Sequence, residues 1–236
     1  MKARGSKALA LVFLLAFGCK SNPNDHPSDR EVEGARLVEE GRYREGLEAF
    51  RQSIQEGRAS YLSLIGMAVA HVNLGDTALF EAFAVEASRA APPGAQAWRR
   101  LGLMYLRGAE RRRDRAGGER YARLAVEYLK RVFADRDGND DPHLLYHLGL
   151  SLVLCGDSEA AVVLLEEEIK RTPNRSDCLH ILIAAHRELG HRERVRELIE
   201  IGVKIDARPE TWESYRRWVD GGPIPGTPPT SAPSEP

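Results

Sequence analysis

The sequence predicts an all-α fold made of helix–turn–helix repeats, and three observations support this prediction. The chain of 236 residues is 42% hydrophobic and 29% charged but only 7% aromatic, a composition typical of a water-soluble helical body. Four glycines, Gly41, Gly75, Gly156 and Gly190, each follow a hydrophobic stretch. The first two are 34 residues apart and so are the last two, with an interval of 81 residues between the pairs. A fixed period of this length predicts stacked units, and the longer interval has room for one further unit and an insertion of 13 residues.

The repeated unit resembles the tetratricopeptide repeat. One stretch carries the first-helix signature of that family, Trp98-x2-Leu101-Gly102-x2-Tyr105. A later stretch repeats the spacing with apolar substitutes, Leu145-x2-Leu148-Gly149-x2-Leu152. The resemblance covers about five units and implies a right-handed superhelix, with partner proteins bound on the concave surface that the first helices line.

A final helix is expected to cap this array. In residues 209–220, the side chains of Trp212, Tyr215 and Val219 fall on one helical face with charged residues between them. An array of repeats needs such an end, because its last unit otherwise exposes an apolar face. We therefore expect Trp212 and Trp218 to be core residues of the cap rather than a ligand site.

The first 18 residues are typical of a targeting segment, because cations precede an apolar run that is too short to span a bilayer as a helix. The cations are Lys2, Arg4 and Lys7, and the run covers residues 8–17. The segment resembles the bacterial lipoprotein signal, which implies removal of residues 1–18 and a palmitate-bearing lipid on Cys19. Lys20 rather than an aspartate follows, which in that family implies the periplasm-facing side of the outer membrane. An ordinary cleaved secretory signal is the alternative.

Polar segments flank the predicted repeat domain, which spans residues 29–220. Residues 20–29 contain two prolines and no apolar side chain, so we expect a flexible tether over residues 19–28. Residues 221–236 contain six of the 13 prolines and are expected to form a disordered tail. Recognition of this tail by an aromatic groove of another protein is the alternative.

The insertion falls near residues 107–120 and holds six arginines against three acids, together with two adjacent glycines. We expect a surface loop that contacts an acidic protein surface or an anionic membrane. The alternative is a solvated extension of the two flanking helices. Nucleic acid is excluded as a partner, because the net charge of the chain is -1 and no aromatic residue interleaves with the arginines.

The first helices are expected to present an apolar strip to a partner. The side chains predicted to make this contact are Leu62, Ile65, Val69, Val72, Asn73, Arg99, Leu103, Leu106, Arg107, Tyr146, Leu150, Val153, His180 and Arg187. Such a strip suits an amphipathic helix or an extended hydrophobic peptide, with the cationic side chains at its edges for carboxylates. The alternative is that the strip is buried, because the superhelix closes on itself or on a neighbouring copy.

The sequence contains no pattern typical of an enzyme, and we expect no enzyme activity, metal, cofactor or small-molecule substrate. His143 and His147 have helical spacing but no third ligand in register. Alternate acids in residues 135–141 resemble a calcium loop, although helix capping explains them better. Cys155 and Cys178 are expected to be buried packing thiols rather than a disulfide.

These features together predict a lipid-anchored adaptor of the bacterial envelope. The layout of signal, tether and repeats resembles the pilotin class of lipoproteins, which implies help in assembling an outer-membrane complex such as the secretin of type IV pili. A self-assembling structural subunit that pairs through the same apolar face is the alternative.

Overall fold

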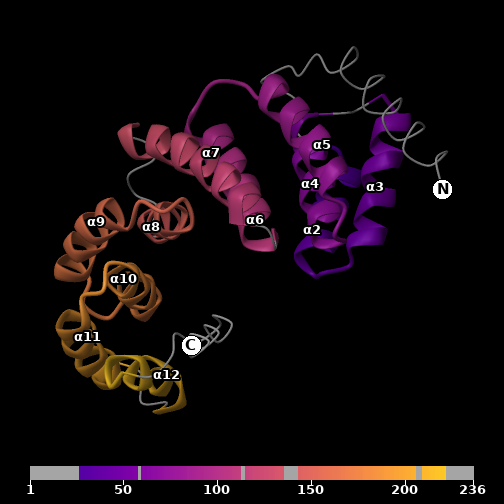
Figure 1. Cartoon of the computed structure of the whole chain (residues 1–236). Helices are drawn as coiled ribbons and strands as arrows, with labels where there is room; N and C mark the ends of the chain where they lie inside the picture. Colours follow the sequence, from indigo (N-terminus) through magenta and orange to yellow (C-terminus); the bar gives the residue numbers. More distant parts are fainter. Residues whose placement is uncertain (1–26, 58–59, 113–114, 136–142, 206–208, 222–236) are drawn as a thin grey trace, which may run out of the picture. The chain divides into compact units, whose positions relative to one another are not determined.

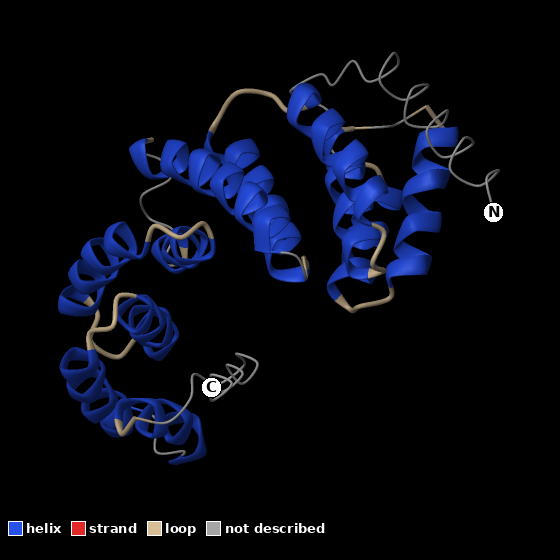
Figure 2. Ribbon diagram, viewed as in Figure 1, coloured by secondary structure: helices blue, strands red, loops and turns tan. Residues whose placement is uncertain are grey.

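The computed structural model describes residues 27–57, 60–112, 115–135, 143–205 and 209–221, and within them every regular element is a helix (Figure 2). The helices, labelled in Figure 1, are α2 (Asp29–Glu39), α3 (Tyr43–Gln55), α4 (Tyr61–Asn73), α5 (Thr77–Ala90), α6 (Ala95–Arg111), α7 (Arg115–Ala134), α8 (Leu144–Leu154), α9 (Ser158–Arg171), α10 (Ser176–Glu188), α11 (Arg192–Ile205) and α12 (Pro209–Val219). Their order is that of five helix pairs followed by one final helix, which confirms the predicted all-α class. None of the helices in the described ranges is long and apolar enough to cross a membrane.

The chain divides into two compact units, residues 1–155 and 156–236. The first unit contains α2 to α8, and in it α2 packs on α3, α4 on α5 and α6 on α7. The second unit contains α9 to α12, and in it each helix packs on the next. The targeting segment, most of the tether, the acid-rich stretch from residue 136 onward and the tail beyond Gly221 lie outside the described residues.

The periodic glycines end helices. Gly75 follows α4 with a φ of +83°, a conformation that disfavours a side chain. Its N–H donates to the carbonyl of Val72 at 3.1 Å, and the N–H of Asp76 donates to the carbonyl of His71 at 2.9 Å. These bonds satisfy carbonyl groups that the end of an α-helix leaves without partners. Gly41, Gly156 and Gly190 have a positive φ in the same way after α2, α8 and α10, whereas the turn between α6 and α7 has no glycine.

Helix α2 begins with a capping box. The hydroxyl of Ser28 accepts a hydrogen bond from the N–H of Glu31 at 3.3 Å, and the Glu31 carboxylate accepts one from the N–H of Ser28 at 2.9 Å. Ser28 is buried and also bonds to the hydroxyl of Ser53 at 2.9 Å. The predicted tether of residues 19–28 is therefore too long at its end, because Ser28 belongs to the folded domain.

The described part of the insertion is helical rather than a loop. Helix α6 continues to Arg111 and α7 starts at Arg115, so the expected surface loop is corrected to an extension of both helices. Arg112 donates to the hydroxyl of Tyr121 at 3.1 Å and lies 5.5 Å from the centre of its ring. The Tyr121 hydroxyl in turn donates to Glu81 at 2.5 Å. Burial, and then the bond to Glu81, raise the pKa of the Tyr121 phenol. One arginine of the insertion is thus part of the packing.

Large side chains of one helix rest on glycines of another. The buried ring of Phe50 from α3 lies against Gly34 of α2 and Gly66 of α4. A Cβ atom at Gly66 would lie 2.2 Å from this ring. The ring of Phe80 from α5 approaches Gly108 of α6 in the same way, where a Cβ would lie 2.4 Å away. Glycine at these positions lets the helices approach closely enough to exclude water from the rings.

The second unit ends with the predicted cap. Trp212 of α12 is fully buried, and its ring lies on Gly202 of α11, where a Cβ would lie 2.4 Å away. Trp218 is also buried, with the guanidinium of Arg192 at 5.2 Å from its ring centre. Both tryptophans are thus core residues of the cap, as predicted.

Alanine substitutions at two helical glycines are expected to change stability in opposite directions. Gly66→Ala should lower the free energy of unfolding by about 1–3 kcal/mol, because the new methyl group overlaps the Phe50 ring. Gly118→Ala should be neutral or raise it by up to about 1 kcal/mol, since its nearest neighbour would lie at 3.4 Å and alanine favours helix. Urea unfolding followed by circular dichroism measures both. Equal effects of the two changes would contradict the close packing of Phe50.

Candidate functional site: the first-helix face

Three first helices of the first unit lie side by side. Helix α4 packs beside α6, and α6 packs beside α8. Each carries a row of residues at helical spacing, so that each row lies on one side of its helix. We call the surface that these rows form the first-helix face: Leu62, Ile65, Val69 and Asn73 from α4, Arg99, Leu103 and Arg107 from α6, and Tyr146, Leu150 and Val153 from α8.

The apolar side chains of the first-helix face are half-buried. Ile65, Val69 and Leu150 pack with one side against the core that contains Phe50 and Phe80. Their remaining surface, like that of Leu103, is accessible to solvent. The apolar side chains of the first-helix face are therefore partly accessible to a partner, and none of them is fully exposed.

Two residues predicted for this contact belong to the core. Val72 is 3% exposed and Leu106 is 4% exposed. Each lies one turn after a buried small residue, Val72 after Ala68 and Leu106 after Gly102, so each falls on the stripe that faces its own hairpin. They are corrected to packing residues.

The polar side chains at the edges already have local contacts. The Asn73 side-chain amide donates to the carbonyl of Val69 at 2.8 Å, on its own helix. Arg107 forms an ion pair with Glu110 at 3.4 Å, but about half of its side chain stays exposed. The exposed pair contributes little to stability. Arg107 therefore remains available to a carboxylate that approaches the face.

His180 and Arg187, predicted to face a partner, instead lie against the cap in the second unit. The imidazole of His180 stacks on Trp212 with ring centres 4.6 Å apart, and its Nδ1 atom lies 3.3 Å from the Tyr215 hydroxyl. The guanidinium of Arg187 lies 6.0 Å from the centre of the Tyr215 ring. Burial raises the pKa of the Tyr215 phenol. These two side chains hold α12 to α10.

A buried carboxylate ties α2 to α4, and sequence reasoning missed it. Glu31, which is 4% exposed, accepts hydrogen bonds from the hydroxyls of Ser60 and Ser63, the latter at 2.7 Å. Its signal in the sequence is the Ser-x-x-Glu pattern of a capping box at Ser28. The carboxylate of Glu31 thus forms hydrogen bonds that hold the start of α2 to α4.

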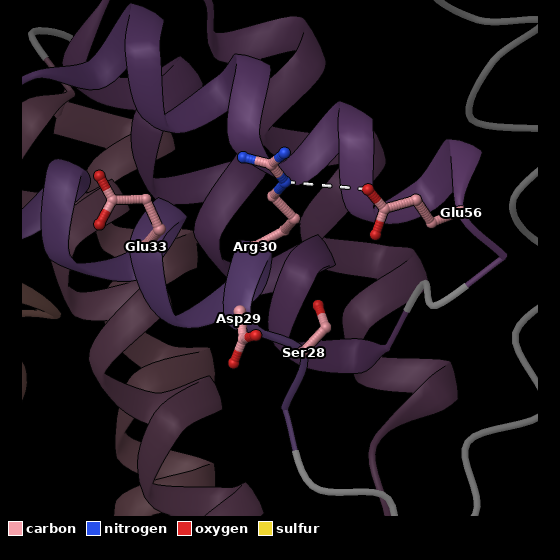
Figure 3. A pocket seen from close by; sticks show the side chains of 5 residues that line it. All are labelled: Ser28, Asp29, Arg30, Glu33 and Glu56. Atoms are coloured by element: carbon pink, nitrogen blue, oxygen red, sulfur yellow. Dashed lines mark ion pairs between the residues drawn. The ribbon is translucent and has the colours of Figure 1, made fainter.

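A polar pocket of about 440 Å³ opens at the start of α2 (Figure 3). It is lined by Ser28, Asp29, Arg30, Glu33 and Glu56. As Figure 3 shows, Arg30 reaches toward Glu56, with Nε 3.8 Å from the carboxylate. The charged lining suits no hydrophobic segment, so the pocket is distinct from the first-helix face in chemistry.

A cluster of polar side chains around His186 connects α9, α10 and α11. Nδ1 of the buried His186 lies 3.1 Å from Nδ1 of His191. Its Nε2 atom has no hydrogen-bond partner among the described residues and lies 3.7 Å from Glu166, which also binds Arg194 at 2.9 Å. Burial lowers the pKa of the His186 imidazole, and the cations nearby lower it further, although Glu166 opposes them. Within the described ranges no group of three or more histidine, cysteine or acidic side chains is placed to hold a metal ion.

Of the two cysteines expected to be buried packing thiols, Cys178 is buried, whereas Cys155 is only half-buried and its thiol donates to the carbonyl of Leu152 at 3.2 Å. Cys155 and Cys178 form no disulfide. Burial, reinforced by Asp177, raises the pKa of the Cys178 thiol to about 12. A thiol with a raised pKa carries little thiolate at neutral pH, so Cys178 is a poor nucleophile.

Stability is expected to fall as the pH falls below about 6.5. Burial lowers the pKa of His71 and of His186 from 6.5, so the unfolded chain binds more protons than the folded one in acid. The contribution of these two histidines to the free energy of unfolding is therefore fully present above about pH 6.5 and is lost progressively below it. Urea unfolding at about pH 7.5 and about pH 5 measures the loss.

A variant of one histidine isolates its share of the pH effect. His186→Gln should show a smaller loss of unfolding free energy between the two pH values than the parent chain. His143→Gln, at an exposed position, serves as the control and should leave the loss unchanged. An undiminished loss in His186→Gln would contradict the assignment.

Comparison with known proteins places the fold. No protein-family model and no curated protein matches the sequence. YrrB, a tetratricopeptide repeat protein described as having an unusual peptide-binding site, is 13% identical with a TM-score of 0.57, over 86% of this chain and 97% of that one. PilF of Pseudomonas aeruginosa is 10% identical with a TM-score of 0.59, over 80% and 81%. TTC0263 of Thermus thermophilus, another tetratricopeptide repeat protein, is 17% identical with a TM-score of 0.53, over 83% and 97%. The chain has the tetratricopeptide repeat fold.

Proposed function

We propose that the chain is an adaptor that binds an amphipathic helix or an extended hydrophobic segment of a partner protein on the first-helix face. The observation that carries the proposal is the row of half-buried apolar side chains on three neighbouring helices. Surfaces of this kind on soluble proteins commonly serve association. A tetratricopeptide repeat neighbour described as binding a peptide supports the same class of role.

The chemistry of the face fits a helical ligand. Leu62, Ile65 and Val69 follow each other at intervals of three and four residues along α4, so a partner helix lying across them would insert its own apolar side chains at similar intervals. Leu103 and Leu150 continue the surface onto α6 and α8. Arg107 at the edge would pair with an acidic residue of the ligand and so fix its direction.

The proposed location is the periplasmic side of the bacterial outer membrane, with a lipid on Cys19 as the anchor. The support for it is the lipoprotein-like segment that ends at Cys19. Two-dimensional confinement by an anchor raises the local concentration of the face near membrane-bound partners. Assistance to an outer-membrane complex, such as a secretin of type IV pili, is the specific role proposed from this layout.

A peptide library displayed on phage tests the binding surface without knowledge of the natural partner. Panning on the purified chain should select peptides with apolar residues at intervals of three and four. Leu103→Asp should weaken the selected peptides by at least about tenfold, which corresponds to about 1.4 kcal/mol, because the new carboxylate would be desolvated under the ligand. Isothermal titration calorimetry measures the affinities.

The control for this test is Val163→Asp on α9, where the side chain is 69% exposed. It adds the same charge outside the first-helix face and should leave the affinity unchanged, while circular dichroism checks that both variants are folded. Selected peptides that bind a folded Leu103→Asp chain at full strength would refute the proposal. A chain that selects no peptides but dimerises through Leu103 would favour the self-assembling subunit.

The anchor is tested by changing the cysteine that carries it. Cys19→Ser should move the protein from the membrane fraction to the soluble fraction, because a chain with no lipid loses its hold on the bilayer. Cys155→Ser, which changes a cysteine within the repeats, should leave the distribution as it is. Metabolic labelling with palmitate followed by fractionation gives the readout. A Cys19→Ser protein that remains in the membrane fraction and is released only by detergent would speak against lipidation.

A further inference from the structure

The end of the second unit carries a groove of about 390 Å³ between α11 and α12. One face of α11 supplies Arg196, Ile199, Glu200, Val203 and Lys204, and the end of α12 supplies Arg216, Val219 and Asp220. The apolar lining consists of the buried Ile199 and Val219 together with Val203, which is 37% exposed. The groove thus has a small apolar centre and a charged rim.

Among the described residues, no second helix packs on α12 in the way that second helices pack on first helices earlier in the chain. Helices α4 and α6 are each followed by a second helix that packs on them, α5 and α7. Helix α12 packs on α11 and, through Trp212, on His180 of α10. The described chain ends at Gly221, directly after α12, and no described helix follows. The groove is therefore a place where a further segment is able to pack.

The chain itself leaves α12 at this groove. Val219 and Asp220 line it, and Gly221 follows with a φ of +95°. The sequence from residue 222 to 236 contains a single large apolar side chain, Ile224. Three residues span at most about 10 Å, so Ile224 stays within reach of Val203 and Val219.

We propose that Ile224 of the chain's own C-terminal segment seats in the groove between α11 and α12 and covers Val203. The groove offers one partly exposed apolar side chain, and the tail offers one apolar side chain to cover it. The rim mixes three cations with two acids, which suits the uncharged stretch of residues 222–226 better than a charged ligand. Prolines on both sides of Ile224 reduce the conformational entropy that docking removes.

The short connection favours the chain's own tail over an external occupant. A segment joined to the groove by three residues has an effective concentration in the millimolar range or above. A single apolar contact that is too weak to recruit a separate molecule is then populated within one chain. Under this proposal, the disordered tail expected from composition is limited to the residues beyond 226. The proposal does not depend on the function proposed for the first-helix face.

Disulfide trapping tests the contact in the full-length chain, in a Cys19→Ser, Cys155→Ser background whose fold is checked by circular dichroism. One variant carries Val203→Cys with Ile224→Cys. The matched control carries Arg217→Cys with Ile224→Cys, since Arg217 is exposed on α12 and closer to Ile224 along the chain. Equilibration in a glutathione buffer gives the effective concentration of each thiol pair.

The expected result is an effective concentration about tenfold or more higher for the 203–224 pair than for the 217–224 pair. A tail that does not dock would favour the 217–224 pair, because its connecting loop is shorter. An equal or reversed ratio would therefore overturn the proposal. Disulfide-linked dimers in place of the intramolecular bond would also overturn it, since they would assign the groove to a second copy.

An alkylation measurement in the same Cys19→Ser, Cys155→Ser background checks this contact without a second introduced cysteine. The thiol of Val203→Cys should react with a maleimide about fivefold faster when Ile224→Ser is added, because the covering side chain is then removed. Thr227→Ser, farther along the tail, serves as the control and should leave the rate as it is. An unchanged rate after Ile224→Ser would overturn the proposal.

Discussion

A large side chain placed on a glycine of a neighbouring helix is the contact on which the rest of this fold depends. The ring of Phe50 touches Gly34 and Gly66, and so joins a first hairpin to the next one. Trp212 rests on Gly202 in the same manner at the end of the chain. Full burial of such a ring contributes about 2–3 kcal/mol. Because each ring is covered by helices from two successive repeats, no repeat can reach this burial alone.

This packing also determines which surface is left for the proposed binding. Rings from second helices, such as Phe50 and Phe80, fill the space between the hairpins. On the opposite sides of α4, α6 and α8, the side chains of Ile65, Leu103 and Leu150 are covered only in part and remain half-buried. A surface of apolar side chains that no partner covers is unfavourable in water, which supports the proposal that the face has a functional role.

Much of the fold was predictable because its signals are local. The glycine at the end of a first helix acts through its own φ and its own hydrogen bonds, so its period of 34 residues is visible in the sequence. The cap was predictable for the same reason, since Trp212, Tyr215 and Val219 fall on one helical face. The buried Glu31 also had a local signal in the capping box that it forms with Ser28, although its contacts with α4 had none.

The errors concern contacts between residues that are distant in the sequence. The adjacent glycines of the insertion suggested a loop, but the contact of Arg112 with Tyr121 and Glu81 holds the helices in place, and tertiary contacts override such local tendencies.

Similar reasoning explains the residues that proved to be core. Val72 and Leu106 lie on the side that faces their own hairpins, although Asn73 and Arg107, which follow them directly, do not. A shift of one position along a helix thus changes the side that a residue faces. The period of the repeat locates helix ends, but it does not determine this rotation. Only the neighbouring hairpins do so, through the side chains that they place against each helix.

Photocrosslinking in living cells tests the central claim most directly, namely that the first-helix face is the surface that meets a partner. A photoreactive amino acid replaces Leu103 in one strain and Val163, on α9, in another. The account predicts one dominant crosslinked protein from position 103, lost when Ile65→Asp is added, and none of comparable yield from position 163. Equal crosslinking at the two positions, or crosslinking at position 163 alone, would contradict the account.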